Sequence, residues 1–370
     1  MMRTPATAEA PPGGMLGQCR RRLSVVSEHM SAPCCTTGTT YGLQVQASAV
    51  VGTDTSGAAD GLTSEELEFF AREGYLVIRR AAEPAACAQA VESMFRAAGR
   101  DPDDRNTWYR AMPSGLTRSG TRHPVQMRHQ ADLEAHMVRA EHCQAAWDIR
   151  TSPRMHKCFS QLWRTERLWL NNSETPEMAR PLFNLKPPVS TLNPGWGGGT
   201  YLHWDASVEP DQAPPLHHGL QIQGVLYLAD TPLNGGGLRV VAGFHRLLER
   251  DPQFARQWHE TRQVLPDNGP GGCMDLAELS GLPVTQLAGR AGDLVVWNSL
   301  LPHGTGKNTA LQPRRALFVS MTPVDRLVAQ HPSRDYATVR EARTIAWHGH
   351  VQSLGPNSSL GKRLIGVEEW

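Results

Sequence analysis

The sequence has no excess of charge of either sign and no long apolar run. Its 370 residues carry 37 basic and 36 acidic side chains, which leaves a formal net charge of +1. A near-neutral chain offers no global basic field for nucleic acid, so we predict no nucleic-acid partner. No apolar run approaches the roughly 18 residues of a membrane span, so we predict no membrane association.

Ordered cysteine spacing is also absent. The 7 cysteines contain no CxxC pair and no regular spacing, which argues against a zinc ribbon or a disulfide framework. We therefore predict a reducing, cytoplasmic compartment, in which most of the cysteines are small buried apolar residues.

Residues 1–60 lack the periodic apolar pattern of helices and strands. They are rich in Ala, Gly, Ser, Thr and Pro, a composition typical of an unstructured tail. Up to Val51 the only acids are Glu9 and Glu28, against four arginines. A basic, acid-poor stretch of this kind is typical of an organellar targeting segment. The sequence leaves both interpretations open.

Residues 61–370 are predicted to form a single domain, because 40% of the chain is hydrophobic and only 20% is charged. Thr63 and Glu66 fit a capping box at the start of a helix that ends near Gly74. Three further segments of this half are expected: helices over 84–98 and over 131–170, the second broken at Pro153, and a long surface loop over 100–130 with lid candidates at 108–110 and 122–123.

The second half changes to short strands separated by Gly-rich turns. The predicted strands cover 75–78, 182–186, 219–230, 238–241, 294–297 and 315–321. A stretch of helix and loop at about 246–284 is interpreted as an insertion. The predicted fold class is therefore mainly β with flanking helices, arranged as a jelly-roll barrel.

The segment Tyr201-Leu202-His203-Trp204-Asp205 reads as a strand with an imidazole and a carboxylate two residues apart. Residues i and i+2 of a strand point to the same face. His203 and Asp205 therefore aim at one point, while Trp204 points away and packs behind the strand. Two of the three ligands of a 2-His-1-carboxylate iron site have this arrangement. Alone the motif is weak evidence, because about one such triplet is expected by chance.

Two later residues strengthen the pattern. His303 follows the strand predicted over 294–297, and Arg314 begins the next strand. An HxD motif, a later His and then an Arg is the order found in 2-oxoglutarate-dependent oxygenases built on the double-stranded β-helix.

The chain resembles the phytanoyl-CoA dioxygenase family over roughly residues 61–325. The residues that carry the resemblance are His203-Trp204-Asp205, the run GLRVVAGFH over 237–245, and His303-Gly304 through Asn308 to Arg314-Arg315-Ala316. The resemblance implies a cupin-like double-stranded β-helix and an enzyme that uses Fe(II), 2-oxoglutarate and O2. It also implies that His203, Asp205 and His303 hold the metal.

The sequence departs from the family pattern in two places. Ala242 stands where Pro is usual, which is a minor change at a turn. The stretch 246–284 is expected to contribute to the substrate wall, which leaves the substrate class open. His245, at the end of the GLRVVAGFH run, is expected to make a structural hydrogen bond.

The resemblance further implies that Arg314 binds the C5 carboxylate of 2-oxoglutarate. Arg suits this task because its planar fork binds a carboxylate with two parallel hydrogen bonds. Arg314 and Arg315 are adjacent on a strand, so only one points inward. The spacing from His303 in the resembling family favours Arg314, and Arg315 is expected at the surface.

Two further residues are candidates for cosubstrate binding. Lys186 resembles a family Lys beside the 2-oxoglutarate site, and the alternative is a solvated Lys at a strand end. Gln223 shares a strand face with Gln221. That face is either the barrel interior, where buried amides need partners, or the solvent side of an edge strand.

The predicted reaction is hydroxylation, or another oxidation, of an unactivated C–H bond in a small-molecule metabolite, with release of succinate and CO2. The candidate substrate residues are Trp196, Tyr201, Trp297 and Asn298. Two alternatives stay open: a catalytically silent jelly roll that binds a ligand, and a cupin-type metalloenzyme that does not use 2-oxoglutarate. The sequence does not decide between a monomer and a homodimer.

Asp205 gives the first testable prediction. Related halogenases have Gly or Ala at the carboxylate position, which opens a site for halide, so an Asp favours oxygenation. We expect Asp205→Ala to abolish substrate-coupled succinate formation, measured by chromatography, because the variant loses one of three metal ligands. Near-normal turnover in this variant would contradict the assignment of Asp205 as a ligand.

Overall fold

The computed structural model describes residues 61–110, 136–193, 196–199, 202–204, 221–264, 277, 280–331, 333–353 and 355–370, together with the strand β1 (Gln46–Ala47). All of these residues belong to one compact unit, residues 43–370. The rest of the predicted tail, the insertion segment 265–276 and the lid candidate 122–123 lie outside the described residues.

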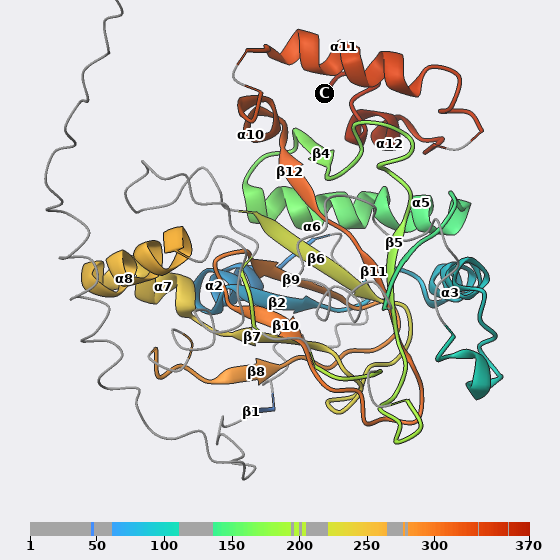
Figure 1. Cartoon of the computed structure of the whole chain (residues 1–370). Helices are drawn as coiled ribbons and strands as arrows, with labels where there is room; N and C mark the ends of the chain where they lie inside the picture. The colour runs from blue at the N-terminus through green and yellow to red at the C-terminus, as the bar shows by residue number, and fades with distance from the viewer. Residues whose placement is uncertain are drawn as a thin grey trace, which may run out of the picture. The chain divides into compact units, whose positions relative to one another are not determined.

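Two sheets form the double-stranded β-helix that the sequence predicted (Figure 1). The larger sheet consists, in spatial order, of β2 (Tyr75–Ile78), β9 (Leu294–Asn298), β6 (Ile222–Tyr227), β11 (Arg314–Phe318), β5 (Leu182–Lys186) and β3 (Met137–Arg139). The smaller sheet consists of β1, β8 (Val284–Gln286), β7 (Leu238–Val241) and β10 (His303–Thr305). Its β1 pairs with β8 in parallel, and the other pairings in both sheets are antiparallel.

Helices flank the sheets (Figure 1). They are α2 (Ser64–Glu73), α3 (Pro84–Ala98), α5 (Gln144–Arg150), α6 (Pro153–Trp163), α7 (Phe244–Arg250), α8 (Pro252–Val264), α10 (Val324–Ala329), α11 (Tyr336–Trp347) and α12 (Ser359–Leu364), with a 3-10 turn, η1, at Arg105–Thr107. Among the described residues, no helix combines the length and the apolar character that crossing a membrane requires.

The first helix begins and ends as the sequence predicted. The Thr63 hydroxyl accepts a hydrogen bond from the Glu66 amide at 3.2 Å, and the Glu66 carboxylate accepts one from the Thr63 amide at 2.9 Å. These two bonds satisfy amide groups that the first turn leaves without partners. The helix ends at Gly74, whose φ of 78° is a left-handed conformation that glycine adopts without a Cβ penalty.

The prediction of helix throughout 131–170 was wrong at both ends of the described part. Met137–Arg139 is β3 and pairs with β5, and Leu168–Leu170 is β4 and pairs with β12 (Met321–Pro323). Both strands have only three residues. A short apolar run does not distinguish a strand from a helix by its periodicity, and pairing with a distant strand decides its conformation.

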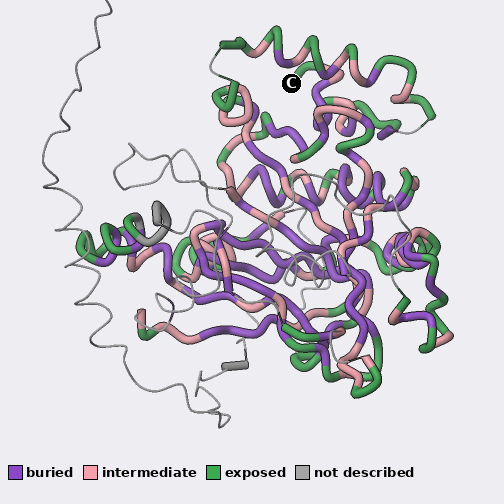
Figure 2. Tube along the Cα trace, in the orientation of Figure 1, coloured by how far each residue is buried: buried purple, intermediate pink, exposed green. Residues whose placement is uncertain are grey.

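The inner and outer faces of the larger sheet follow from two contacts. The Trp297 ring on β9 lies 5.2 Å from the ring of His303 on the smaller sheet, so the Trp297 face lines the interior. Gly224 follows the cross-strand partner of Trp297 and therefore faces the opposite side of the sheet. A Cβ added at Gly224 would lie 3.1 Å from the Phe159 ring of α6. Helix α6 therefore covers the outer face, and Figure 2 shows the strands between these layers as buried.

Candidate active site

The structure brings His203 and His303 together across the smaller sheet. The amide of each residue donates to the carbonyl of the other at 2.9 Å, which makes an antiparallel bridge. The two ring centroids lie 4.5 Å apart. His303 is buried, with 3% of its surface exposed, and His203 is half-buried. Two imidazoles one hundred positions apart in sequence therefore face the same small volume.

The tautomer of His303 is fixed by its surroundings. Nδ1 lies 2.9 Å from the carbonyl oxygen of Leu301. A carbonyl oxygen only accepts, so Nδ1 carries a proton, which leaves Nε2 as the nitrogen that would bind a metal. This is the arrangement in which a histidine binds a metal, because the backbone acceptor both orients the ring and selects the tautomer.

The predicted third ligand, Asp205, lies outside the described residues, as does Tyr201. In the part of the chain that the structure describes, no three His, Cys, Asp or Glu side chains are close enough to hold a metal. Trp204, between the two predicted ligands, points away as expected. It is buried, and its ring lies 5.8 Å from Phe244 and 5.9 Å from Trp258. Trp204 therefore points away from the side on which His203 meets His303.

Arg314 is a buried cation on the inner side of the larger sheet. Its exposed fraction is 3%. Its Nη1 donates to the Asn184 amide oxygen at 2.8 Å, and its guanidinium lies 5.5 Å from the centroid of the Tyr227 ring. The side chain of Arg314 pairs with no carboxylate of the described residues, and its Nε has no partner among them.

The environment of Arg314 favours an anionic ligand. Burial lowers the pKa of its guanidinium, and the hydroxyl of Tyr227 partly offsets that effect. A buried charge is costly unless an opposite charge or a set of hydrogen bonds satisfies it. A small carboxylate would supply the missing charge and accept from the remaining N–H groups.

Arg315 faces the other side of the same strand. Its guanidinium lies 5.5 Å from the centroid of the Phe95 ring of α3, and its Nη2 donates to the Gln312 side-chain oxygen at 3.0 Å. The residue is half-buried rather than fully at the surface. The guanidinium itself packs on α3, and its Nε is buried without a hydrogen-bond partner among the described residues.

Lys186 lies directly opposite Arg314 in the register of β5 and β11. Only 1% of its surface is exposed, so the alternative of a solvated strand end was wrong. The ammonium donates to the Thr305 hydroxyl at 2.8 Å and to the Gly306 carbonyl at 2.9 Å. Two buried cations thus lie side by side in the barrel.

Sequence reasoning missed Thr305, Asn184 and Tyr227. Thr305 lies two residues after His303, and Asn184 lies two residues before Lys186, so each shares the inward face of its neighbour. That spacing was a usable signal. Tyr227 carried no comparable signal. Its hydroxyl donates to the Leu287 carbonyl at 2.9 Å and accepts from the Leu238 amide at 3.1 Å, and both contacts depend on the fold.

The remaining predicted site residues that the structure describes lie in three places. Trp297 packs against His303 and lies opposite Gln223 in the register of β6 and β9, so both belong to the inner face. Asn298 is the next residue on β9, and its side-chain oxygen accepts from the Leu300 amide at 2.9 Å, within the turn before His303. Trp196 packs against His136, with ring centroids 5.6 Å apart, and its ring also lies 6.1 Å from Tyr109 and 5.1 Å from the Arg100 guanidinium.

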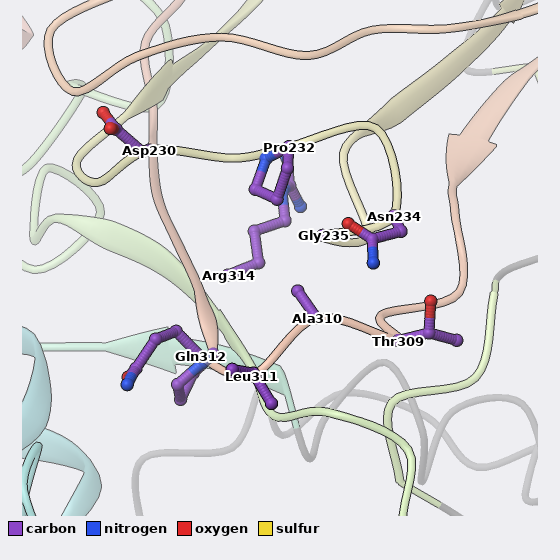
Figure 3. A pocket seen from close by; sticks show the side chains of 10 residues that line it. Asp230, Pro232, Asn234, Gly235, Thr309, Ala310, Leu311, Gln312 and Arg314 are labelled. Carbon is purple, nitrogen blue, oxygen red and sulfur yellow. The ribbon is translucent and has the colours of Figure 1, made fainter.

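A pocket of about 370 Å³ lies beside Arg314 (Figure 3). In the figure, Asp230, Pro232 and Asn234 lie on one side, and Ala310, Leu311 and Gln312 lie on the other. Neither His203 nor His303 lines it. The pocket therefore lies at the Arg314 end of the barrel and not between the two imidazoles.

His136, immediately before β3, extends the group of buried titratable side chains. Its ring is hydrogen-bonded to the backbone of Leu185. Burial, and then the positive charges of Lys186 and Arg100, lower the pKa of His136 to about 3. The ring is therefore neutral at pH 7. Its Nδ1 is buried and has no hydrogen-bond partner among the described residues.

His245 has the structural role that the sequence predicted. Its Nε2 donates to the carbonyl of Ala71 in α2 at 3.1 Å, and the side chain is buried. The contact ties the end of the GLRVVAGFH run to the first helix and leaves the ring away from the two predicted metal ligands.

Comparison with known proteins gives one family and several similar proteins. The family model described as phytanoyl-CoA dioxygenase matches residues 70–316, which is more than half of the chain. A Dictyostelium discoideum protein named "Putative phytanoyl-CoA dioxygenase" is 25% identical over 69% of this chain and 74% of its own length. Ava biosynthesis cluster protein O of Aspergillus versicolor is 23% identical over 69% of this chain and 76% of its own length. The solved structure of EctD from S. alaskensis with 2-oxoglutarate and 5-hydroxyectoine has a TM-score of 0.47 and 17% identity, covering 77% of this chain and 84% of that one.

His136 gives a prediction on pH and stability. Its pKa in the folded protein, about 3, lies below its unfolded value of 6.5. The unfolded chain therefore binds the extra proton between these two values, and stability falls as pH decreases below 6.5. Between pH 7 and pH 5, protonation of His136 in the unfolded chain should lower the free energy of unfolding by about 2 kcal/mol.

We expect His136→Gln to flatten the profile of unfolding free energy between pH 7 and pH 5 by that amount, measured by urea denaturation. Substituting the exposed His348 by Gln controls for the loss of a histidine as such. An unchanged slope in His136→Gln would show that the ring is not buried in its neutral form.

Proposed function

Because the chain belongs to the phytanoyl-CoA dioxygenase family, we propose that it is an Fe(II)/2-oxoglutarate-dependent dioxygenase that hydroxylates an unactivated C–H bond of a small metabolite. Succinate and CO2 are the coproducts. The family uses Fe(II), 2-oxoglutarate and O2. The observation that carries the proposal is Arg314, a guanidinium buried on the inner face without a carboxylate partner among the described residues.

The metal would be held by His203, His303 and Asp205. The paired backbone bridge of the two histidines and the Nδ1–H bond of His303 to Leu301 support this assignment, because they direct two ring nitrogens to one place. With its cosubstrate and O2, the bound Fe(II) supplies the oxidising power that breaks the substrate C–H bond. The protein's own part is to fix the coordination geometry and to keep the surrounding cavity dry.

Arg314 would hold the far carboxylate of 2-oxoglutarate, and Lys186 would add a second positive charge beside it. Asn184 and Tyr227 orient the guanidinium, so binding of the ligand does not have to restrict the side chain of Arg314 further. The ammonium of Lys186 is held by Thr305 and Gly306. Two cations in register stabilise a carboxylate more strongly than one cation does, since each stabilises negative charge in the same low-dielectric space.

Two apolar side chains border His303, which supports a substrate with an aliphatic portion. Trp297 packs on the His303 ring, and Val240 lies directly opposite His303 in the register of β7 and β10. Both are buried. Apolar walls bind hydrocarbon and exclude water from the reacting centre. An Asp at position 205 favours oxygenation over halogenation. A metalloenzyme that does not use 2-oxoglutarate would have no use for the buried Arg314.

The adjacent arginines provide a matched test of the cosubstrate site. We expect Arg314→Gln to weaken 2-oxoglutarate binding to the Mn(II)-loaded protein roughly 30-fold or more, because removing one partner of a buried charge pair costs about 2–5 kcal/mol. Isothermal titration calorimetry without O2 measures this directly. Arg315→Gln should leave the affinity within about twofold of wild type, because its side chain lies on the outer face.

Two results would contradict the proposal. One is wild-type protein that binds Mn(II) but shows no 2-oxoglutarate binding. The other is an equal loss of affinity in Arg314→Gln and Arg315→Gln, which would indicate a general effect of charge and not a specific anchor.

A further inference from the structure

Asn308 is a buried amide in the connection between His303 and Arg314. None of its surface is exposed. Its Nδ2 donates to the carbonyl of Lys186 at 2.9 Å and to the carbonyl of Gln312 at 3.0 Å. Its Oδ1 accepts from the Ala310 amide at 3.1 Å. Carbonyls only accept and amides only donate, so these partners fix the orientation of the side chain.

The backbone of Asn308 makes two more long-range bonds. Its amide donates to the Gly197 carbonyl at 2.9 Å, and its carbonyl accepts from the Val189 amide at 2.8 Å. Both partners belong to the segment of the chain between the end of β5 at Lys186 and His203. One residue therefore joins this loop, the end of β5 and the connection from β10 to β11.

These contacts hold Lys186 at two points. Asn308 binds its backbone carbonyl, while Thr305 and Gly306 bind its ammonium. All three residues belong to the same short segment, 305–308. The segment thus sets the position of both the backbone and the ammonium of Lys186 relative to β10, the strand that begins with His303.

The close packing around Asn308 leaves little room for adjustment. Gly236, in the turn between β6 and β7, has a φ of 76°, and a Cβ added there would lie 3.0 Å from the Asn308 Cβ. The neighbouring Thr309 amide donates to the Asn234 carbonyl at 2.7 Å. The turn before β7 therefore fixes the far side of Asn308.

We propose that Asn308 is a positioning residue of the cosubstrate site. Its side chain links the Lys186 carbonyl to the connection that precedes Arg314, so that the side chains of Lys186 and Arg314 meet one dicarboxylate. The inference rests on the proposed function. Asn308 acts through its neighbours, because its side-chain bonds go to backbone groups of Lys186, Gln312 and Ala310.

The chemistry of the site explains why an amide is required. Two backbone carbonyls need donors, and one backbone amide needs an acceptor, within a single side chain. An aspartate of the same shape keeps the acceptor but places a carboxylate oxygen against two carbonyl oxygens. It would repel them and would also neutralise part of the positive charge that the ligand needs.

The test compares Asn308→Asp with Ser173→Ala in the full chain. Ser173 is buried near the C-terminal helices, where its hydroxyl donates to the Leu170 carbonyl and accepts from Arg343. It is a control for loss of a buried hydrogen bond away from the site. We expect both variants to lower the melting temperature of the metal-free protein.

Only Asn308→Asp should weaken the binding of 2-oxoglutarate to the Mn(II)-loaded protein, by tenfold or more in calorimetry. Its Mn(II) affinity should stay within about twofold of wild type, since Asn308 does not touch the two histidines. Wild-type affinity for 2-oxoglutarate in Asn308→Asp, or an equal loss in Ser173→Ala, would overturn the proposal.

Asn308→Ser provides a milder variant if the aspartate prevents folding. A serine hydroxyl donates only one hydrogen bond, so we expect an intermediate loss of 2-oxoglutarate affinity at unchanged Mn(II) affinity. No loss would again overturn the role of Asn308. Absence of 2-oxoglutarate binding in the Mn(II)-loaded wild type would instead refute the proposed function, which keeps the two failures distinguishable.

Discussion

The interior of this barrel is governed by the need to satisfy two buried cations. Lys186 and Arg314 face each other across two strands of the larger sheet, each with almost no exposed surface. Removing a guanidinium from water costs several kcal/mol unless the protein or a ligand compensates. Asn184, Tyr227, Thr305 and Gly306 supply neutral acceptors or an aromatic face. For Arg314, which pairs with no carboxylate of the described residues, a bound carboxylate would supply the negative charge.

Strand register is what brings these groups together. Pairing of β5 with β11 places Lys186 opposite Arg314, and pairing of β7 with β10 places a buried valine opposite His303. The isolated bridge between His203 and His303 places the two predicted histidine ligands side by side at the start of β10. Because side chains alternate along a strand, a shift of one residue would turn each of these groups to the opposite face. The site therefore depends on the register as much as on residue type.

Much of this arrangement follows from local sequence patterns. Because side chains alternate between the two faces of a strand, the sequence predicted that Arg314 and Arg315 face opposite sides and that Trp204 points away from His203. The capping box located the first helix. The patterns did not reveal β3 and β4, whose three residues become strands only by pairing with distant partners. They also did not reveal Asn308 as a junction, because its partners Lys186, Val189 and Gly197 are separated from it by more than a hundred positions in sequence. Long-range contacts of this kind have no local signature.

We propose that one small volume of this barrel holds both a metal and a dicarboxylate. Crystals grown with Mn(II) and 2-oxoglutarate test this through an anomalous-scattering map. We expect a single metal peak within bonding distance of His203, His303 and Asp205, with the far carboxylate of 2-oxoglutarate on Arg314. A metal peak away from the two histidines, or an Arg314 without the carboxylate, would contradict it.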